Sequence, residues 1–274
     1  MTAVCSVCPH RCRLEEGQTG LCRARGQVRG RIVSLNYGRV TGLALDPIEK
    51  KPLKRFYPGS MILSVGSYGC NMRCPFCQNH EISMTAGDEV SWVPLTPDEL
   101  AEKAVSLKNR GNLGLAFTYN EPCVGFEYVR DTARLVHEAG MKNILVTNGF
   151  TEPWVEDELL PWIDAMNVDL KGFTESYYRK LGGDLGTVKA FIRRAAAGCH
   201  VELTTLIVPG ENDGEELEAM VSWIADTDPS IPLHITRFFP RWHMTDKDPT
   251  PVETIYQTVR MAKEKLKYVY AGNC

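Results

Sequence analysis

Residues 61–79 read MILSVGSYGCNMRCPFCQN. The first six residues form an apolar run of strand length, and Gly66 marks its end. A loop follows at once and carries Cys70, Cys74 and Cys77 in a C-x3-C-x2-C spacing. In parallel sheets, binding and catalytic groups gather in loops of this kind, at the carboxyl ends of strands. The stretch therefore predicts a buried strand and, directly after it, a site.

The chain beyond residue 58 alternates between apolar runs of strand length and longer stretches with helical spacing. Helices are expected over 97–110, where Thr96 suits an N-cap, over 124–139, which Gly140 ends, and over 252–267. A further short strand fits 268–270. Repeated strand-helix units predict a parallel sheet covered by helices, either a curved partial barrel or a doubly wound open sheet. The six main strands are expected near 61–66, 113–118, 143–147, 166–170, 201–208 and 233–238.

Residues 1–58 differ in character from the rest. They are rich in cysteine, glycine and arginine, and short alternating runs such as residues 31–35 suit small strands. Pro58 and Gly59 punctuate the end of this part. The sequence thus predicts a cysteine-rich accessory segment over 1–58, with a possible metal site, and a larger α/β domain over 59–274.

Composition limits the classes of partner. The net charge of −3 gives no bulk attraction to nucleic acid, and no stretch is long enough to cross a bilayer. The amino terminus lacks a basic segment followed by an apolar run, so a cytoplasmic protein is expected. Of the ten cysteines, seven fall in two tight groups. Clustered cysteines in a chain without a secretion signal indicate metal binding rather than disulfides.

The three cysteines after the first strand can hold a 4Fe-4S cluster. Four irons and three thiolates leave one iron without a protein ligand, and the amine and carboxylate of an amino acid can chelate it. An alternative adds His80 to Cys70, Cys74 and Cys77, which would close a four-coordinate structural zinc site.

The second group of cysteines lies near the amino terminus. Its spacing is C-x2-C-P-H-x-C followed by a fourth cysteine, and four thiols in so short a segment indicate a metal. Tetrathiolate zinc and a second iron–sulfur cluster are both open, and the latter could relay electrons. The group consists of Cys5, Cys8, Cys12 and Cys22.

The C-x3-C-x2-C loop, with Phe76 before its third cysteine, resembles the radical S-adenosylmethionine (radical SAM) superfamily. The resemblance implies a partial (β/α)6 barrel of TIM type. It also implies a 4Fe-4S cluster that reductively cleaves S-adenosylmethionine to a 5'-deoxyadenosyl radical, which abstracts hydrogen from a substrate. The three cysteines would be both cluster ligands and the catalytic centre.

Polar residues at successive strand ends would hold the cofactor in that family. Glu121 matches the last residue of the family's Gly-Gly-Glu motif, whereas Tyr119 and Asn120 replace its glycines. Glu121 would meet the methionine amine and Lys171 its carboxylate, although turn formation is the alternative for most residues of this kind. The cofactor-binding group implied by the resemblance is Asn120, Glu121, Thr147, Asn148, Asp169, Lys171 and His234, and Arg237, Arg241 and Trp242 would line the substrate entrance.

Over nearly its whole length the chain resembles the AmmeMemoRadiSam-type radical enzymes, which are related to pyruvate formate-lyase activating enzymes. Residues 45–53 and 56–59 also carry this likeness. It implies an activase that removes a hydrogen from a glycine of a partner glycyl radical enzyme. A low-potential electron donor of the flavodoxin or ferredoxin type would supply the activase with electrons. One alternative is radical modification of a small molecule, another protein residue or a nucleotide. Another is a zinc-stapled binding protein without turnover.

Overall fold

Eight strands form one curved sheet in the computed structural model, which describes residues 2–274. β6 (Gly42–Pro47) runs antiparallel to its neighbour β7 and forms one edge. The other neighbouring pairs are parallel. The parallel strands are β7 (Met61–Gly66), β9 (Asn112–Phe117), β10 (Lys142–Thr147), β11 (Ala165–Asp169), β12 (His200–Ile207), β13 (Leu233–Arg237) and β14 (Val269–Gly272).

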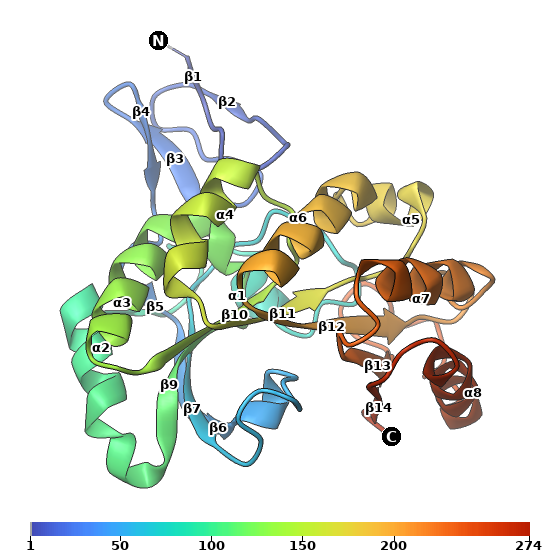
Figure 1. Ribbon diagram of the computed structural model, residues 1–274. Coiled ribbons are helices and arrows are strands. Elements are labelled where there is room, and N and C mark those ends of the chain that lie inside the picture. The colour runs from blue at the N-terminus through green and yellow to red at the C-terminus, as the bar shows by residue number, and fades with distance from the viewer. Residues whose placement is uncertain (1) are drawn as a thin grey trace.

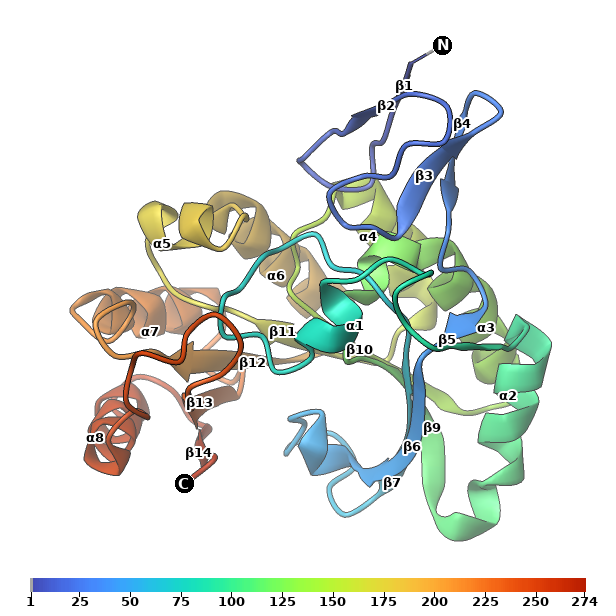
Figure 2. The same ribbon diagram turned by 180° about the vertical axis from the view of Figure 1, so that it is seen from behind.

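The order of the strands settles which closure the sheet adopts. Neighbours follow one another in chain order from β6 to β14, without a reversal. Right-handed crossovers that all advance in one direction place their helices on the same face. Figures 1 and 2 show the longer helices on one side of the sheet and the cysteine loop on the other. The expected partial barrel is thus confirmed, and a doubly wound sheet is not what forms.

The helices follow the expected alternation. Thr96 caps α2 (Pro97–Ser106) with a capping box, and the rest of the range expected as one helix is the 3-10 turn η2 (Lys108–Arg110). α3 (Phe126–Glu138) follows η3 (Pro122–Gly125), and α8 (Val252–Lys263) precedes β14. The others are α1 (His80–Ser83), α4 (Pro153–Leu159), η4 (Leu160–Trp162), α5 (Glu175–Lys180), α6 (Leu185–Gly198) and α7 (Glu216–Thr227).

The strands from β7 to β11 contribute to two separate apolar layers. Side chains of successive strand residues point to opposite faces, so Leu63 faces the helices and Ile62 the concave side. The larger core fills the space between sheet and helices. A smaller core on the concave side contains Ile62 and Ile144 together with Ile48 and Leu53, from the segment after β6.

The segment after β6 covers the concave face. It contains the 3-10 turn η1 (Ile48–Lys50) and is fixed by a buried carboxylate, because the backbone N–H groups of Lys54 and Arg55 donate to Glu202 at 3.0 and 2.7 Å. Within the accessory segment expected over 1–58, this part and β6 thus belong to the sheet and its core. The division at residue 58 stays a prediction.

The amino-terminal part consists of short strands. β1 (Ala3–Val4) pairs with β2 (Arg13–Leu14), and β3 (Arg25–Val28) pairs with β4 (Arg31–Ser34). β5 (Arg39–Val40) pairs with β8 (Val93–Pro94). β1 to β4 lie together near α4, at one end of the molecule (Figures 1 and 2). Among residues 2–274, no helix combines the length and apolar character needed to cross a membrane.

Candidate functional site

The three-cysteine loop is tied to the end of β9 by Asn120. The Asn120 Oδ1 atom accepts a hydrogen bond from the backbone N–H of Ser67 at 2.9 Å. Its Nδ2 donates to the carbonyl oxygens of Tyr68 and Gly69 at 3.2 and 3.1 Å. Asn120 therefore fixes the chain just before Cys70, and the cofactor contact expected of it from sequence stays a prediction.

The three thiols lie in surroundings that favour their protonated forms. Burial raises the pKa of Cys70 well above its usual value, and the nearby Glu121 adds to the rise. Burial also raises the pKa of Cys74 to about 11, whereas the charge of Lys171 opposes the rise. The pKa of Cys77 is raised by burial as well. A metal that binds here must displace these protons, so its affinity depends on pH.

The three free thiols of this loop match the protein ligands of a cluster with one open iron. Among residues 2–274, no three Cys, His, Asp or Glu side chains converge closely enough to hold one metal ion. A zinc ion needs its thiolates at about 2.3 Å, whereas each cysteine of a cubane binds a different iron. The His80 ring stacks on Trp242, with centroids 5.4 Å apart, and its Nδ1 lies 3.2 Å from the Cys77 carbonyl oxygen. The donor set thus fits a 4Fe-4S cluster.

Glu121 joins the ends of two strands. Its Oε1 atom accepts hydrogen bonds from the Thr147 hydroxyl at 2.7 Å and from the Cys123 N–H at 3.0 Å. Its Oε2 atom accepts one from the Asn148 N–H at 2.7 Å. Burial raises the pKa of Glu121, and these three donors oppose the rise. Oε2, with a single donor, is the oxygen with capacity left for an ammonium group.

Asn148 connects β10 to the cysteine loop. Its Nδ2 donates to Asn71 Oδ1 at 3.0 Å and lies 3.6 Å from the Cys70 sulfur. The Met72 N–H donates to the same sulfur at 3.4 Å. Hydrogen bonds to the ligating sulfurs are one means by which proteins set the potential of a cluster.

Asp169 and Lys171 form an ion pair at the end of β11, with 2.8 Å between Oδ2 and Nζ. Burial would lower the pKa of Lys171, but Asp169 and Cys74 raise it well above its usual value. The lysine therefore stays charged next to the cysteine loop, where an anionic group can bind it.

His234 lies apart from the other predicted residues. It is the second residue of β13, near the amino end of the strand, and its register partner is Thr204. Its Nε2 lies 2.6 Å from Glu202 Oε2, and its ring stacks on Tyr270. The ring is thus engaged where the segment after β6 covers the sheet.

The expected substrate entrance is only partly assembled at the loop. Trp242 lies against His80, and the next residue, His243, donates its N–H to the Pro75 carbonyl at 3.0 Å. Arg241 is bridged to Met244 in the same turn. Arg237 instead donates from Nε to the Thr250 carbonyl.

Sequence reasoning did not single out Tyr119, Lys51 or Asp46. Tyr119 has φ of +74°, a backbone region that favours glycine, which is the residue the family motif has at this point. The Tyr119 hydroxyl donates to Asp46 Oδ2 at 3.1 Å, and Lys51 Nζ lies 3.0 Å from the same oxygen. The missing glycine was the available signal for Tyr119. Lys51 and Asp46 lie in a segment whose position only the fold reveals.

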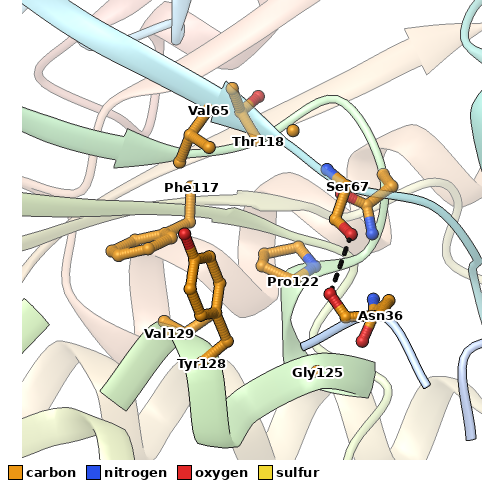
Figure 3. Close-up of a pocket in the computed structure, with 11 residues that line it drawn as sticks. Asn36, Val65, Ser67, Phe117, Thr118, Pro122, Gly125, Tyr128 and Val129 are labelled. Atoms are coloured by element: carbon orange, nitrogen blue, oxygen red, sulfur yellow. Dashed lines mark hydrogen bonds between the residues drawn. The ribbon is translucent and has the colours of Figure 1, made fainter. Parts of the chain in front are cut away.

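The helix side of the same strand ends offers little space. A cavity of about 30 Å³, enough for one water molecule, lies between Ser67, Phe117 and Tyr128. Figure 3 shows Ser67 and Asn36 closing it, with the Ser67 hydroxyl 3.4 Å from the Asn36 carbonyl oxygen.

Known proteins resemble this chain over most of its length. The family model described as the radical SAM superfamily matches residues 64–224, more than half of the chain. The chain is 40% identical to the protein MJ0808 of Methanocaldococcus jannaschii over 98% of its own length and 80% of that protein.

Relatives whose names state an activity are less similar to this chain. The pyruvate formate-lyase 1-activating enzyme of Escherichia coli is 28% identical over 54% of this chain, and the match covers 61% of that enzyme. A domain of the pyruvate formate-lyase-activating enzyme of Bacteroides vulgatus has the same fold, with a TM-score of 0.52 and 17% identity. That match covers 58% of this chain and 99% of the domain.

Proposed function

Because the chain belongs to the radical SAM superfamily, we propose that it cleaves S-adenosylmethionine reductively at a 4Fe-4S cluster held by Cys70, Cys74 and Cys77. The observation that carries this proposal is the set of three free thiols in one short loop at the carboxyl end of β7. Three protein ligands for four irons leave one iron open to an amine and a carboxylate.

The residues around the loop would position the cofactor. When bound and reduced, the cluster supplies one electron to the sulfonium of S-adenosylmethionine, which yields methionine and a 5'-deoxyadenosyl radical. Lys171 keeps N–H groups free for the methionine carboxylate besides its bond to Asp169. Glu121 Oε2 is available to the ammonium group. Asn120 holds the loop at a fixed place relative to β9.

The substrate that we propose is a glycine of a partner glycyl radical enzyme. The likeness to the activating enzyme of E. coli supports this, although it covers only part of that enzyme. The 5'-deoxyadenosyl radical would take one hydrogen atom from the glycine and leave the radical on the partner. A low-potential protein of the flavodoxin or ferredoxin type would supply the electron.

The reaction is tested by incubating anaerobically prepared protein with dithionite and S-adenosylmethionine. We expect 5'-deoxyadenosine to form with the reductant and not without it. A preparation with a full complement of iron and sulfide that forms none would overturn the proposal. A preparation that holds only zinc at the three cysteines would do the same.

The target is tested separately, with a partner enzyme deuterated at glycine. If glycine is the substrate, deuterium appears in 5'-deoxyadenosine and a glycyl radical signal appears on the partner. Formation of unlabelled 5'-deoxyadenosine by an active enzyme would leave the cleavage reaction intact and exclude this partner as its substrate.

A further inference from the structure

The four amino-terminal cysteines are free thiols gathered in one small unit. Cys5, Cys8 and Cys22 are buried, and Cys12 is half-buried. Pairing of β1 with β2 extends to Cys5, whose N–H donates to the Cys12 carbonyl at 2.9 Å. The turn that carries Cys22 lies against Cys12. Gly20 of this turn is so close that a Cβ added to it would lie 3.6 Å from the Cys12 sulfur.

Buried cationic donors lie next to these thiols. Arg25 is only 4% exposed, and its Nε has no hydrogen-bond partner. The Nη1 atom of Arg23, directly after Cys22, is also buried without a partner. An unpaired buried N–H is costly, and an absent negatively charged group with several acceptors would account for both of these atoms.

Four thiols can bind either a tetrathiolate zinc ion or an iron–sulfur cluster. The two groups differ in what they can do here, because zinc has no redox chemistry and a cluster can carry an electron.

The unit touches the loop after β7 at two points. The His10 Nε2 atom lies 2.8 Å from the Asn71 carbonyl oxygen. The Asn71 side chain also contacts the Cys8 thiol. The second point of contact is between Gly69 and Cys22. The two residues are so close that any Cβ at Gly69 would collide with the Cys22 carbonyl oxygen. Gly69 and Asn71 are the two neighbours of Cys70 in the chain.

We propose that Cys5, Cys8, Cys12 and Cys22 hold a second iron–sulfur cluster that passes electrons to the cluster at Cys70, Cys74 and Cys77. The proposal rests on the proposed function for its electron acceptor. The protein donor gives one electron to the amino-terminal cluster. That cluster then gives one electron to the cluster at Cys70, Cys74 and Cys77. The amino-terminal cluster is thus reduced and reoxidised once per turnover, and no bond forms or breaks. Asn71 contacts the amino-terminal unit through His10, and Asn148 connects Asn71 to the Cys70 sulfur.

Metal content tests the site in the full chain, prepared anaerobically. We expect about eight irons and eight sulfides per chain, falling to about four each in the double variant Cys8→Ser with Cys22→Ser. The triple variant Cys70→Ser, Cys74→Ser, Cys77→Ser should also keep about four, with the electron paramagnetic resonance signal of a reduced cluster. Cys199→Ser and Cys274→Ser, which lie outside both groups, serve as controls and should keep all eight.

The outcomes separate this proposal from the proposed function. Zinc in place of iron in the triple variant, or a triple variant without iron, overturns the second cluster and leaves the first untouched. If iron remains in the triple variant but wild-type protein forms no 5'-deoxyadenosine, the proposed function fails and the second cluster stands.

The relay itself has a readout beyond metal content. In the Cys8→Ser, Cys22→Ser variant, cleavage driven by reduced flavodoxin should fall at least about tenfold, whereas cleavage driven by dithionite should stay within about twofold, since dithionite can reduce the remaining cluster directly. An equal fall with both reductants would reveal a purely structural unit and overturn the relay.

Discussion

Cys74 is the most buried of the three cysteines in the loop after β7, with 6% of its surface exposed. We expect Cys74→Ala to abolish formation of 5'-deoxyadenosine, because a cluster held by two thiolates is not retained in an open-site geometry. The cost in stability should be small, about 1 kcal/mol, since a thiol is replaced by a methyl group of similar polarity. Product analysis and thermal unfolding measure the two effects, with Cys274→Ala as control. Cleavage that survives in Cys74→Ala would remove this residue from the cluster.

Glu121 combines a structural and a binding role in one carboxylate. Glu121→Gln replaces one carboxylate oxygen by an amide N–H₂ group. That group then faces another donor, which is either the Asn148 N–H or the Thr147 hydroxyl together with the Cys123 N–H. We expect the free energy of unfolding to fall by about 1 to 3 kcal/mol. Binding of S-adenosylmethionine should weaken by a similar amount, on the order of 1.5 to 3 kcal/mol, because a charge-assisted contact is lost.

Denaturant unfolding and equilibrium binding report these two effects separately. Glu158→Gln, an exposed carboxylate paired with Arg130, is the matched control and should change neither. Lower stability with unchanged binding would restrict Glu121 to positioning Thr147 and Asn148.

At the scale of elements, Glu202 of β12 connects the sheet to the segment after β6. Burial would raise its pKa, but hydrogen bonds from His200, His234 and the N–H groups of Lys54 and Arg55 lower it to about 2. A carboxylate with a lowered pKa contributes stability that is present above its unfolded value of about 4.3 and is lost as the pH falls toward 2. The concave face should therefore open first in acid.

We expect Glu202→Gln to destabilise the protein at pH 7 by about 1.5 to 3 kcal/mol, since an amide cannot accept from all four donors. The difference between variant and wild type should shrink as the pH falls from about 4.3 to 2. Chemical unfolding across this pH range measures it, with Glu253→Gln, an exposed partner of Arg260, as control. A difference that does not depend on pH would mean that the charge of Glu202 plays no part.

Elements with local signals were predicted closely, and those with distant partners were not. The apolar run 61–66 coincides with β7, and Thr96 caps α2 as its sequence indicates. β6 was missed because residues 42–47 are a strand only through pairing with β7. The strand predicted over 233–238 forms as β13, but the partners of His234, which are Glu202 and Tyr270, lie far from it in the chain and are evident only from the fold.

At the scale of the whole molecule, the contact between the two cysteine groups also could not be predicted from local sequence. Their spacing is evident from sequence, whereas the contact of His10 with Asn71 joins residues 61 positions apart. The loop after β7 could be placed at the mouth of the barrel from the strand-helix alternation alone. The amino-terminal unit could not be placed at all, because it docks through Arg25 on α3 rather than through a sheet.

That docking rests on an ion pair between Arg25 and Glu127, at 2.7 Å, whose side chains are 5% and 26% exposed. We expect Glu127→Ala to destabilise the amino-terminal unit by about 3 kcal/mol, because Arg25 stays buried without its partner. Hydrogen exchange should then speed up in β3 and β4 while the barrel strands keep their protection. Glu138→Ala, in an exposed pair with Arg134 on the same helix, is the control and should leave exchange unchanged. Adding Arg25→Met to Glu127→Ala should restore part of the protection, since no buried charge then remains. Faster exchange throughout the sheet in Glu127→Ala would instead mean that the amino-terminal unit and the barrel unfold as one.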